Sequence, residues 1–177
     1  MINDRYTIYL AGNYKDSFSL STMKLLRDKI KAELYRKGVK EVNIIVGGIE
    51  IDNEDTKSKL RDTKALIETT SDKAKIHASK DNGYKSRSEM ILYYFDENLD
   101  SFPQMLAEYV VECDMKDYIT KIATLDMIHD SDLKTSINQV YRFRANTKHF
   151  GSILELVKFI MNDKKGVDLV RQMKANN

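Results

Sequence analysis

The stretch Tyr6-Thr7-Ile8-Tyr9-Leu10 combines β-branched, aromatic and aliphatic residues, and it is followed by the pair Gly12-Asn13. Such a run favours a short strand, and a Gly-Asn pair is typical of a turn. A second run of the same character is Glu41-Val42-Asn43-Ile44-Ile45-Val46. A strand, a connecting helix and a strand at this spacing favour two parallel strands with a right-handed crossover. The connecting helix is predicted by apolar residues at spacings of three and four, closed by a glycine that suits a helix end: Met23, Leu26, Ile30, Leu34 and Gly38.

From Ser86 onward the apolar residues recur at helical spacing almost to the end of the chain. Sparse glycine and a single proline, Pro103, fit short connections between helices. The successive stripes are Met90, Ile91, Tyr94 and Phe95; Met105, Leu106, Tyr109 and Val110; Tyr118, Ile119, Ile122 and Leu125; Ile137, Val140 and Tyr141; and Phe150, Ile153, Leu154, Val157, Phe159 and Ile160, before a short last helix around residues 167–173.

These patterns predict an α+β fold. A small N-terminal strand-helix-strand unit at residues 1–55 would precede a mostly helical region at residues 56–177, a bundle of about five helices. The polar stretch at residues 52–62 is the best candidate for a linker, although the whole chain also suits a single domain.

Composition restricts the class of protein. The chain has 177 residues, of which 42% are hydrophobic and 32% charged, and no segment has the length of apolar sequence that a membrane-spanning helix needs. The N-terminus lacks the pattern of a secretory signal. The single cysteine, Cys113, excludes an internal disulfide framework and a Cys-rich zinc site. We therefore expect a cytoplasmic protein with no membrane partner.

The net charge of +2 conceals a strong alternation along the chain. Residues 56–88 carry nine basic and four acidic side chains, residues 89–133 carry two and eleven, and residues 134–177 carry nine and three. Two interpretations remain open. The blocks of one sign attract partners of the opposite sign, or acidic and basic blocks face one another within the fold and cancel.

The segment Gly83-Tyr84-Lys85-Ser86-Arg87-Ser88-Glu89-Met90-Ile91 resembles the turn and second-helix start of the ribbon-helix-helix family of DNA-binding proteins. On that plan, residues 64–70 are the ribbon strand, residues 72–79 helix A and residues 86–97 helix B. The resemblance implies a homodimer whose paired strands enter the major groove while the start of helix B holds a phosphate. The DNA contacts that it implies are Lys64, Lys85, Ser86 and Arg87.

Two local alternatives compete with that plan. Residues 66–70 and 73–77 alternate in the manner of a hairpin around Ser71-Asp72, and Ser86 with Glu89 matches the capping box of an ordinary helix.

A second basic element follows at Tyr141-Arg142-Phe143-Arg144, with Lys148 just beyond it. Arginine interleaved with aromatic residues suits contact with phosphates and bases, so Arg142, Arg144 and Lys148 are candidate DNA-binding residues. On a helix the two arginines lie about 200° apart, which favours instead a structural role for the aromatic residues between them.

The acidic block supports a different function. Glu108, Glu112 and Asp117 would repel DNA, but they suit docking to a basic protein, for instance inhibition of a nucleic-acid enzyme. Solvated helix faces are the plain alternative.

Enzymatic chemistry has weaker candidates. His129-Asp130 resembles the paired metal ligands of helical phosphohydrolases, with His77 and Asp163 or Asp168 as further ligands, and residues 8–12 resemble the first strand and turn of nucleoside deoxyribosyltransferase-like folds. Cys113 lies between two carboxylates, which disfavour a thiolate nucleophile. We predict no enzyme, metal or cofactor, but a homodimeric DNA-binding regulator or accessory protein of a plasmid, phage or other mobile element.

Overall fold

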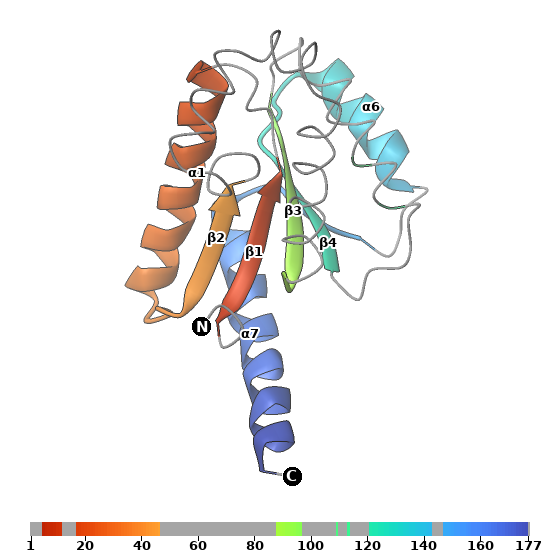
Figure 1. The fold of residues 1–177 in the computed structure, drawn as a ribbon. Coiled ribbons are helices and arrows are strands. Elements are labelled where there is room, and N and C mark those ends of the chain that lie inside the picture. Colours follow the sequence, from red (N-terminus) through yellow and green to blue (C-terminus); the bar gives the residue numbers. More distant parts are fainter. Residues whose placement is uncertain are drawn as a thin grey trace, which may run out of the picture.

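The computed structural model describes residues 5–11, 17–46, 88–96, 109, 113, 121–142 and 147–176. Within these ranges the chain forms a five-stranded sheet in which every neighbouring pair of strands is parallel (Figure 1). The strand order is β2-β1-β3-β4-β5. The strands are β1 (Tyr6–Ala11), β2 (Val42–Val46), β3 (Met90–Phe95), β4 (Lys121–Asp126) and β5 (Lys148–Phe150), and the helices include α1 (Ser17–Arg36), α6 (Ser131–Arg142) and α7 (Ile153–Ala175).

The two N-terminal strands and the helix between them lie where the sequence predicts them. β1 and β2 pair in parallel with Tyr6 opposite Val42. The predicted apolar stripe of α1 is its buried face, with Ile30 and Leu34 almost completely enclosed. Gly38 adopts a φ of 83°, and its N–H donates to the carbonyl of Tyr35 at 2.9 Å. A glycine adopts this left-handed backbone at little cost, so it can end the helix and turn the chain into β2.

The predicted helical bundle is wrong. The stripe at residues 90–95 is strand β3 rather than part of a helix from residue 86 to 97, and Ile122 and Leu125 belong to β4. The reason is burial on both faces. Met90, Ile91, Leu92, Tyr93 and Phe95 are each exposed by 1% or less, since helices cover the sheet on both sides. Strands of that kind are continuous apolar runs without alternation, and periodicity cannot distinguish them from a buried helix.

The last two helices agree better with the sequence pattern. The stripe at residues 137–141 lies in α6. The stripe after it forms α7, except that Phe150 belongs to β5. The separate helix expected at residues 167–173 is the second half of α7, because the chain continues helically through Gly166.

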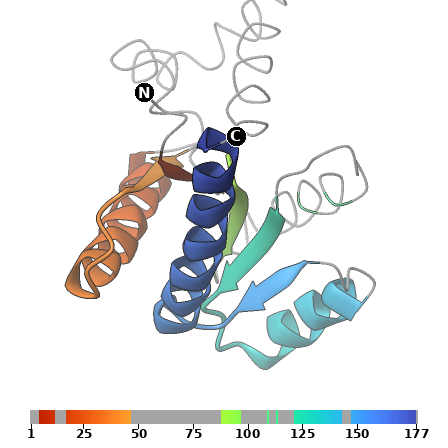
Figure 2. The same cartoon turned by 90° about the horizontal axis from the view of Figure 1, so that it is seen from below.

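Helices cover both faces of the sheet (Figure 2). On one face α1 and α7 pack on a core that includes Tyr6, Ile8 and Leu10 of β1. On the other face α6 contributes Ile137 to a core that includes Tyr9 of β1. Alternate residues of a strand point to opposite faces, so β1 supplies both cores. The fold is therefore a three-layer α/β arrangement around a parallel sheet, not an α+β fold with a separate bundle.

Several predicted features fall outside the described residues. They are the linker at 52–62, the ribbon strand at 64–70, helix A at 72–79, and the hairpin alternative at 66–77. None of the helices in the described ranges is both long and apolar enough to cross a membrane.

Candidate anion-binding site

The residues predicted to touch DNA or protein are largely outside the described ranges. Lys148 is exposed on β5, the strand at one edge of the sheet, and Arg142 ends α6, although its side chain is not described. The others are Lys64, Lys85, Ser86, Arg87 and Arg144 for DNA and Glu108, Glu112 and Asp117 for a protein partner, and all of them lie outside the described residues. These contacts remain predictions.

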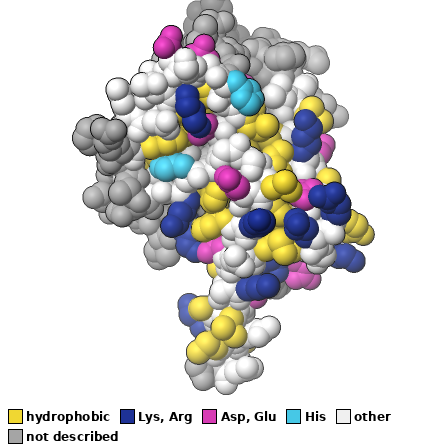
Figure 3. Space-filling view, turned by 180° about the vertical axis from the view of Figure 1, so that it is seen from behind, with side chains coloured by type: hydrophobic (Ala, Val, Ile, Leu, Met, Phe, Trp, Pro, Cys, Tyr) yellow, Lys and Arg dark blue, Asp and Glu magenta, His cyan; other side chains and the backbone are white. Residues whose placement is uncertain are grey.

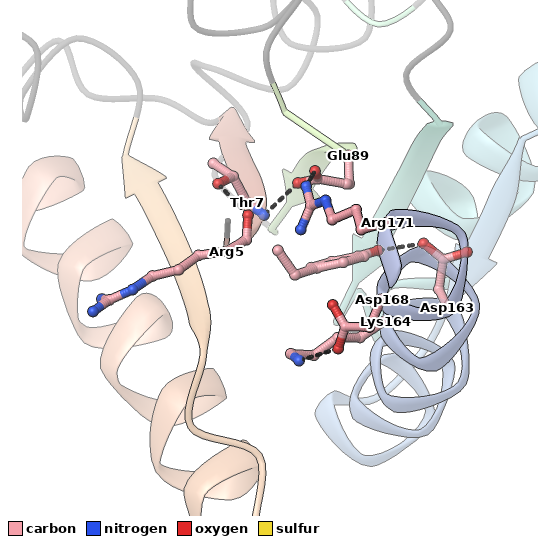
Figure 4. A network of polar contacts seen from close by, with 8 residues as sticks. Arg5, Thr7, Glu89, Asp163, Lys164, Asp168 and Arg171 are labelled. Carbon is pink, nitrogen blue, oxygen red and sulfur yellow. Dashed lines mark hydrogen bonds and ion pairs between the residues drawn. The ribbon is translucent and has the colours of Figure 1, made fainter. Parts of the chain in front are cut away.

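Charged residues of the acidic and basic blocks meet at the amino ends of the strands (Figure 4). Glu89, which precedes β3, forms an ion pair with Arg171 of α7 and accepts the N–H of Thr7. At the start of β4, Lys121 pairs with Asp163 of α7, which also accepts the hydroxyl of Tyr6 at 2.6 Å. Burial together with this hydrogen bond raises the pKa of Tyr6 well above its ordinary value. In these two ion pairs the opposite charges cancel within the fold, and the pairs connect α7 to the sheet.

A second polar cluster lies where β4 ends. Asp126 is 3% exposed, pairs with Lys134 of α6 and accepts the hydroxyl of Tyr141 at 3.2 Å. The ring of Tyr141 stacks on His149 of β5, with 3.6 Å between ring centroids. Both ring nitrogens of His149 bond to threonine hydroxyls, Nδ1 to Thr124 at 2.8 Å and Nε2 to Thr147 at 3.0 Å. This cluster connects β4, α6 and β5 through an ion pair and hydrogen bonds among its own side chains.

The sequence candidates for metal binding do not assemble in the described part of the chain. Asp130 caps α6, because its Oδ1 accepts the N–H groups of Asp132 and Leu133 at 3.0 Å. Asp163 and Asp168 lie on α7, where each pairs with a lysine. Among the described residues no three His, Cys, Asp or Glu side chains are placed to share a metal ion, and His77 lies outside them.

The surroundings of the half-buried His149 predict that stability depends on pH. Burial lowers the pKa of His149 below its ordinary 6.5, an effect that Asp126 partly opposes. The neutral ring is therefore preferred in the folded state, so its stabilising effect is complete above pH 6.5 and is lost as the pH falls toward the lowered pKa. We expect the free energy of unfolding in urea to fall between pH 7.5 and 5.5, and to fall less in His149→Asn. His129→Asn, at an exposed histidine, is the matched control and should keep the wild-type slope. Equal slopes in all three proteins would contradict the assignment.

A hollow of about 630 Å³ lies between the C-terminal half of α1 and the start of β2. Of the described residues that line it, four are cationic and none is acidic: Arg5, Lys31, Arg36 and Lys40. Arg5 and Lys40 come close because β1 and β2 are parallel with Tyr6 opposite Val42, so the residues just before the two strands lie near one another. In Figure 4 the Arg5 side chain extends past β2 toward α1, away from Glu89.

One cation of the hollow, Lys31, lies in surroundings that disfavour its charge. Burial lowers the pKa of Lys31, Arg27 and Arg5 lower it further, and only Asp28 opposes them. Arg36 keeps an ion pair with Glu33 at 2.7 Å, but Glu33 is not part of the lining. An anion in the hollow would relieve the repulsion between the cations. The arrangement can therefore hold a phosphate or another multivalent anion.

Tyr35 forms part of the same wall. Its side chain is 65% exposed, and the Nζ of Lys40 lies over the ring, 5.3 Å from the centroid. Asn43 of β2 is also part of the lining. The hollow thus combines cations with an accessible aromatic ring.

Sequence reasoning missed this site because residues 1–55 carry nine basic and nine acidic side chains, a net charge of zero. The hollow also lies at the amino end of β2, whereas parallel sheets usually bind ligands at the carboxyl ends of their strands. The loops that follow β1, β2 and β3 at that other end are outside the described residues.

Comparison of the chain with protein-family models, with curated proteins and with solved structures finds no match in any of the three.

Proposed function

We propose that this protein binds nucleic acid, with DNA as the first ligand to test, by holding backbone phosphates in the hollow between α1 and β2. The observation that carries this proposal is the lining of the hollow by four cations with no acidic residue among the described ones. Phosphate contacts from lysine and arginine supply most of the sequence-independent affinity for DNA. Arginine adds paired hydrogen bonds to phosphate oxygens.

A second contact remains part of the proposal. Lys148 is exposed on β5, at the opposite edge of the sheet from β2. Four spacings between strands separate these edges, about 19 Å at roughly 4.8 Å per spacing. Consecutive phosphates of one DNA strand follow one another at about 3.4 Å along the helix axis. A bound strand that reached both sites would therefore be several nucleotides long.

The test compares two charge reversals of equal size. In fluorescence anisotropy with labelled DNA, we expect the variant Lys31→Glu/Lys40→Glu to bind at least tenfold more weakly at 50 mM salt. Its salt dependence should also be shallower by about two units of log Kd per log salt, since each lost phosphate contact removes roughly one.

The matched control is Lys158→Glu/Lys165→Glu, which changes net charge equally at two exposed lysines of α7. It should retain most of the affinity if location matters rather than total charge. Equal losses in both variants would contradict the site. No binding of the wild type to DNA at micromolar protein and 50 mM salt would contradict the function.

A further inference from the structure

We propose that the hollow between α1 and β2 takes an unpaired nucleotide of a single strand, with its base stacked on Tyr35 and its phosphates held by the surrounding lysines and arginines. This inference rests on the proposed function and names the kind of nucleic acid that the site prefers.

The first argument is the position of Tyr35. It lies in the last turn of α1, lines the hollow and is 65% exposed, whereas Tyr6, Tyr9, Tyr93 and Tyr109 are exposed by 2% or less. An aromatic ring that is open to solvent beside several cations is the arrangement used by proteins that bind single strands, where bases stack on rings and cations follow the backbone. Bases in a duplex are already paired and stacked, so their faces are not available to such a ring.

The second argument is the size and chemistry of the space. A volume of about 630 Å³ lies within the range of roughly 300–1,000 Å³ that is typical of sites for small molecules. A surface that only followed a backbone would need charge but no hollow of this size. Asn43 of β2 is also part of the lining. A nucleotide would therefore meet a ring for its base and cations for its phosphates.

The third argument is the contact between Lys40 and Tyr35. The Nζ atom of Lys40 lies 5.3 Å from the centroid of the Tyr35 ring, so the two side chains form a cation–π pair. A phosphate attached to a stacked nucleotide would lie close to this ammonium group. On arrival of the ligand, the lysine can exchange its contact with the ring for a contact with phosphate.

The experiment uses the absence of tryptophan from the chain. Tyr35→Trp introduces a single fluorophore at the proposed stacking position, and a stacked base should quench its emission. Leu25→Trp, at a 56% exposed position of the same helix, is the matched control and should not be quenched. The probes are a 12-nucleotide single-stranded oligothymidine and a hairpin duplex with the same number of phosphates, each titrated into the full chain.

We expect quenching of Tyr35→Trp by the single strand and not by the duplex. In anisotropy, Tyr35→Ala should lose about tenfold in affinity for the single strand and little for the duplex, while Tyr35→Phe should behave as wild type because the ring is kept.

Two results separate this inference from the proposed function. If Lys31→Glu/Lys40→Glu abolishes binding while Tyr35→Ala changes nothing, phosphates are bound at the hollow but no base stacks there, and the inference is overturned alone. If the wild type binds but the charge reversal has no effect, the nucleic-acid site lies elsewhere and both proposals fall. Equal quenching of Tyr35→Trp by single strand and duplex would also overturn the inference.

Discussion

Replacing Leu92 by alanine should lower the free energy of unfolding by about 3 kcal/mol, the largest effect that we expect from a single substitution in this chain. Leu92 lies in β3, between β1 and β4, and its side chain is completely buried in the core under α1 and α7. Truncation removes buried apolar surface and leaves a cavity that neighbouring strands are unable to fill. Urea denaturation followed by circular dichroism measures the change.

Leu25→Ala is the matched control, because this leucine is 56% exposed on α1. Its loss should stay below about 1 kcal/mol, since little apolar surface leaves water at that position. A loss at position 92 as small as that at position 25 would contradict the central place of β3 in the sheet.

The second large effect is expected at the ion pair that connects β3 to α7. Glu89→Gln should cost about 2 kcal/mol, because it leaves the charge of Arg171 without its counterion in a setting where the two side chains are 16% and 32% exposed. Among the described atoms, Nη1 of Arg171 is buried and has no hydrogen-bond partner, so the guanidinium already depends on Glu89. The full cost of a deeply buried pair is not expected, because solvent still reaches the arginine.

A double substitution and a surface control define this prediction. Glu89→Gln/Arg171→Met should recover part of the lost stability, since removing both charges avoids an uncompensated one. Asp28→Asn removes the 64% exposed partner of Arg27 and should change stability by less than about 1 kcal/mol. If the double variant is less stable than Glu89→Gln alone, packing of the arginine side chain outweighs the charge pair.

The second half of α7, which carries Arg171, projects beyond the body of the molecule (Figure 3). Leu169, Val170 and Met173, near the end of this helix, are exposed.

Elements with one buried face were predictable from the residues alone. α1 buries a stripe at spacings of three and four and exposes its charged residues, so its period is visible in the sequence. The same holds for the apolar stripe of α6. β1 is also predictable, although it is buried on both faces, because a Gly-Asn turn signal follows it and a second strand lies one helix further on.

β3 and β4 were not predictable in that way. Their burial on both faces removes the alternation that identifies a strand, and Met90-Ile91-Leu92-Tyr93-Tyr94-Phe95 fits a helical stripe equally well. Only the pairing of β3 with β1 and β4 shows that residues 90–95 form a strand and not a helix. This pairing joins residues that are about 80 and 30 positions apart in the chain. The choice between an α+β and an α/β fold therefore depended on long-range pairing.

The candidate site also has features that the sequence shows and features that only the tertiary structure shows. The cationic character of Arg5, Lys31 and Lys40 is visible in the sequence, and so is the amphipathic helix that carries Lys31 and Tyr35. Their meeting in one hollow is not visible, because Arg5 and Lys40 are distant in sequence and become neighbours only through the parallel register of β1 and β2. Local residue patterns were sufficient for elements whose faces differ in polarity. Tertiary pairing was required wherever both faces are apolar or where charges from separate segments converge, since neither situation leaves a periodic signal in the chain.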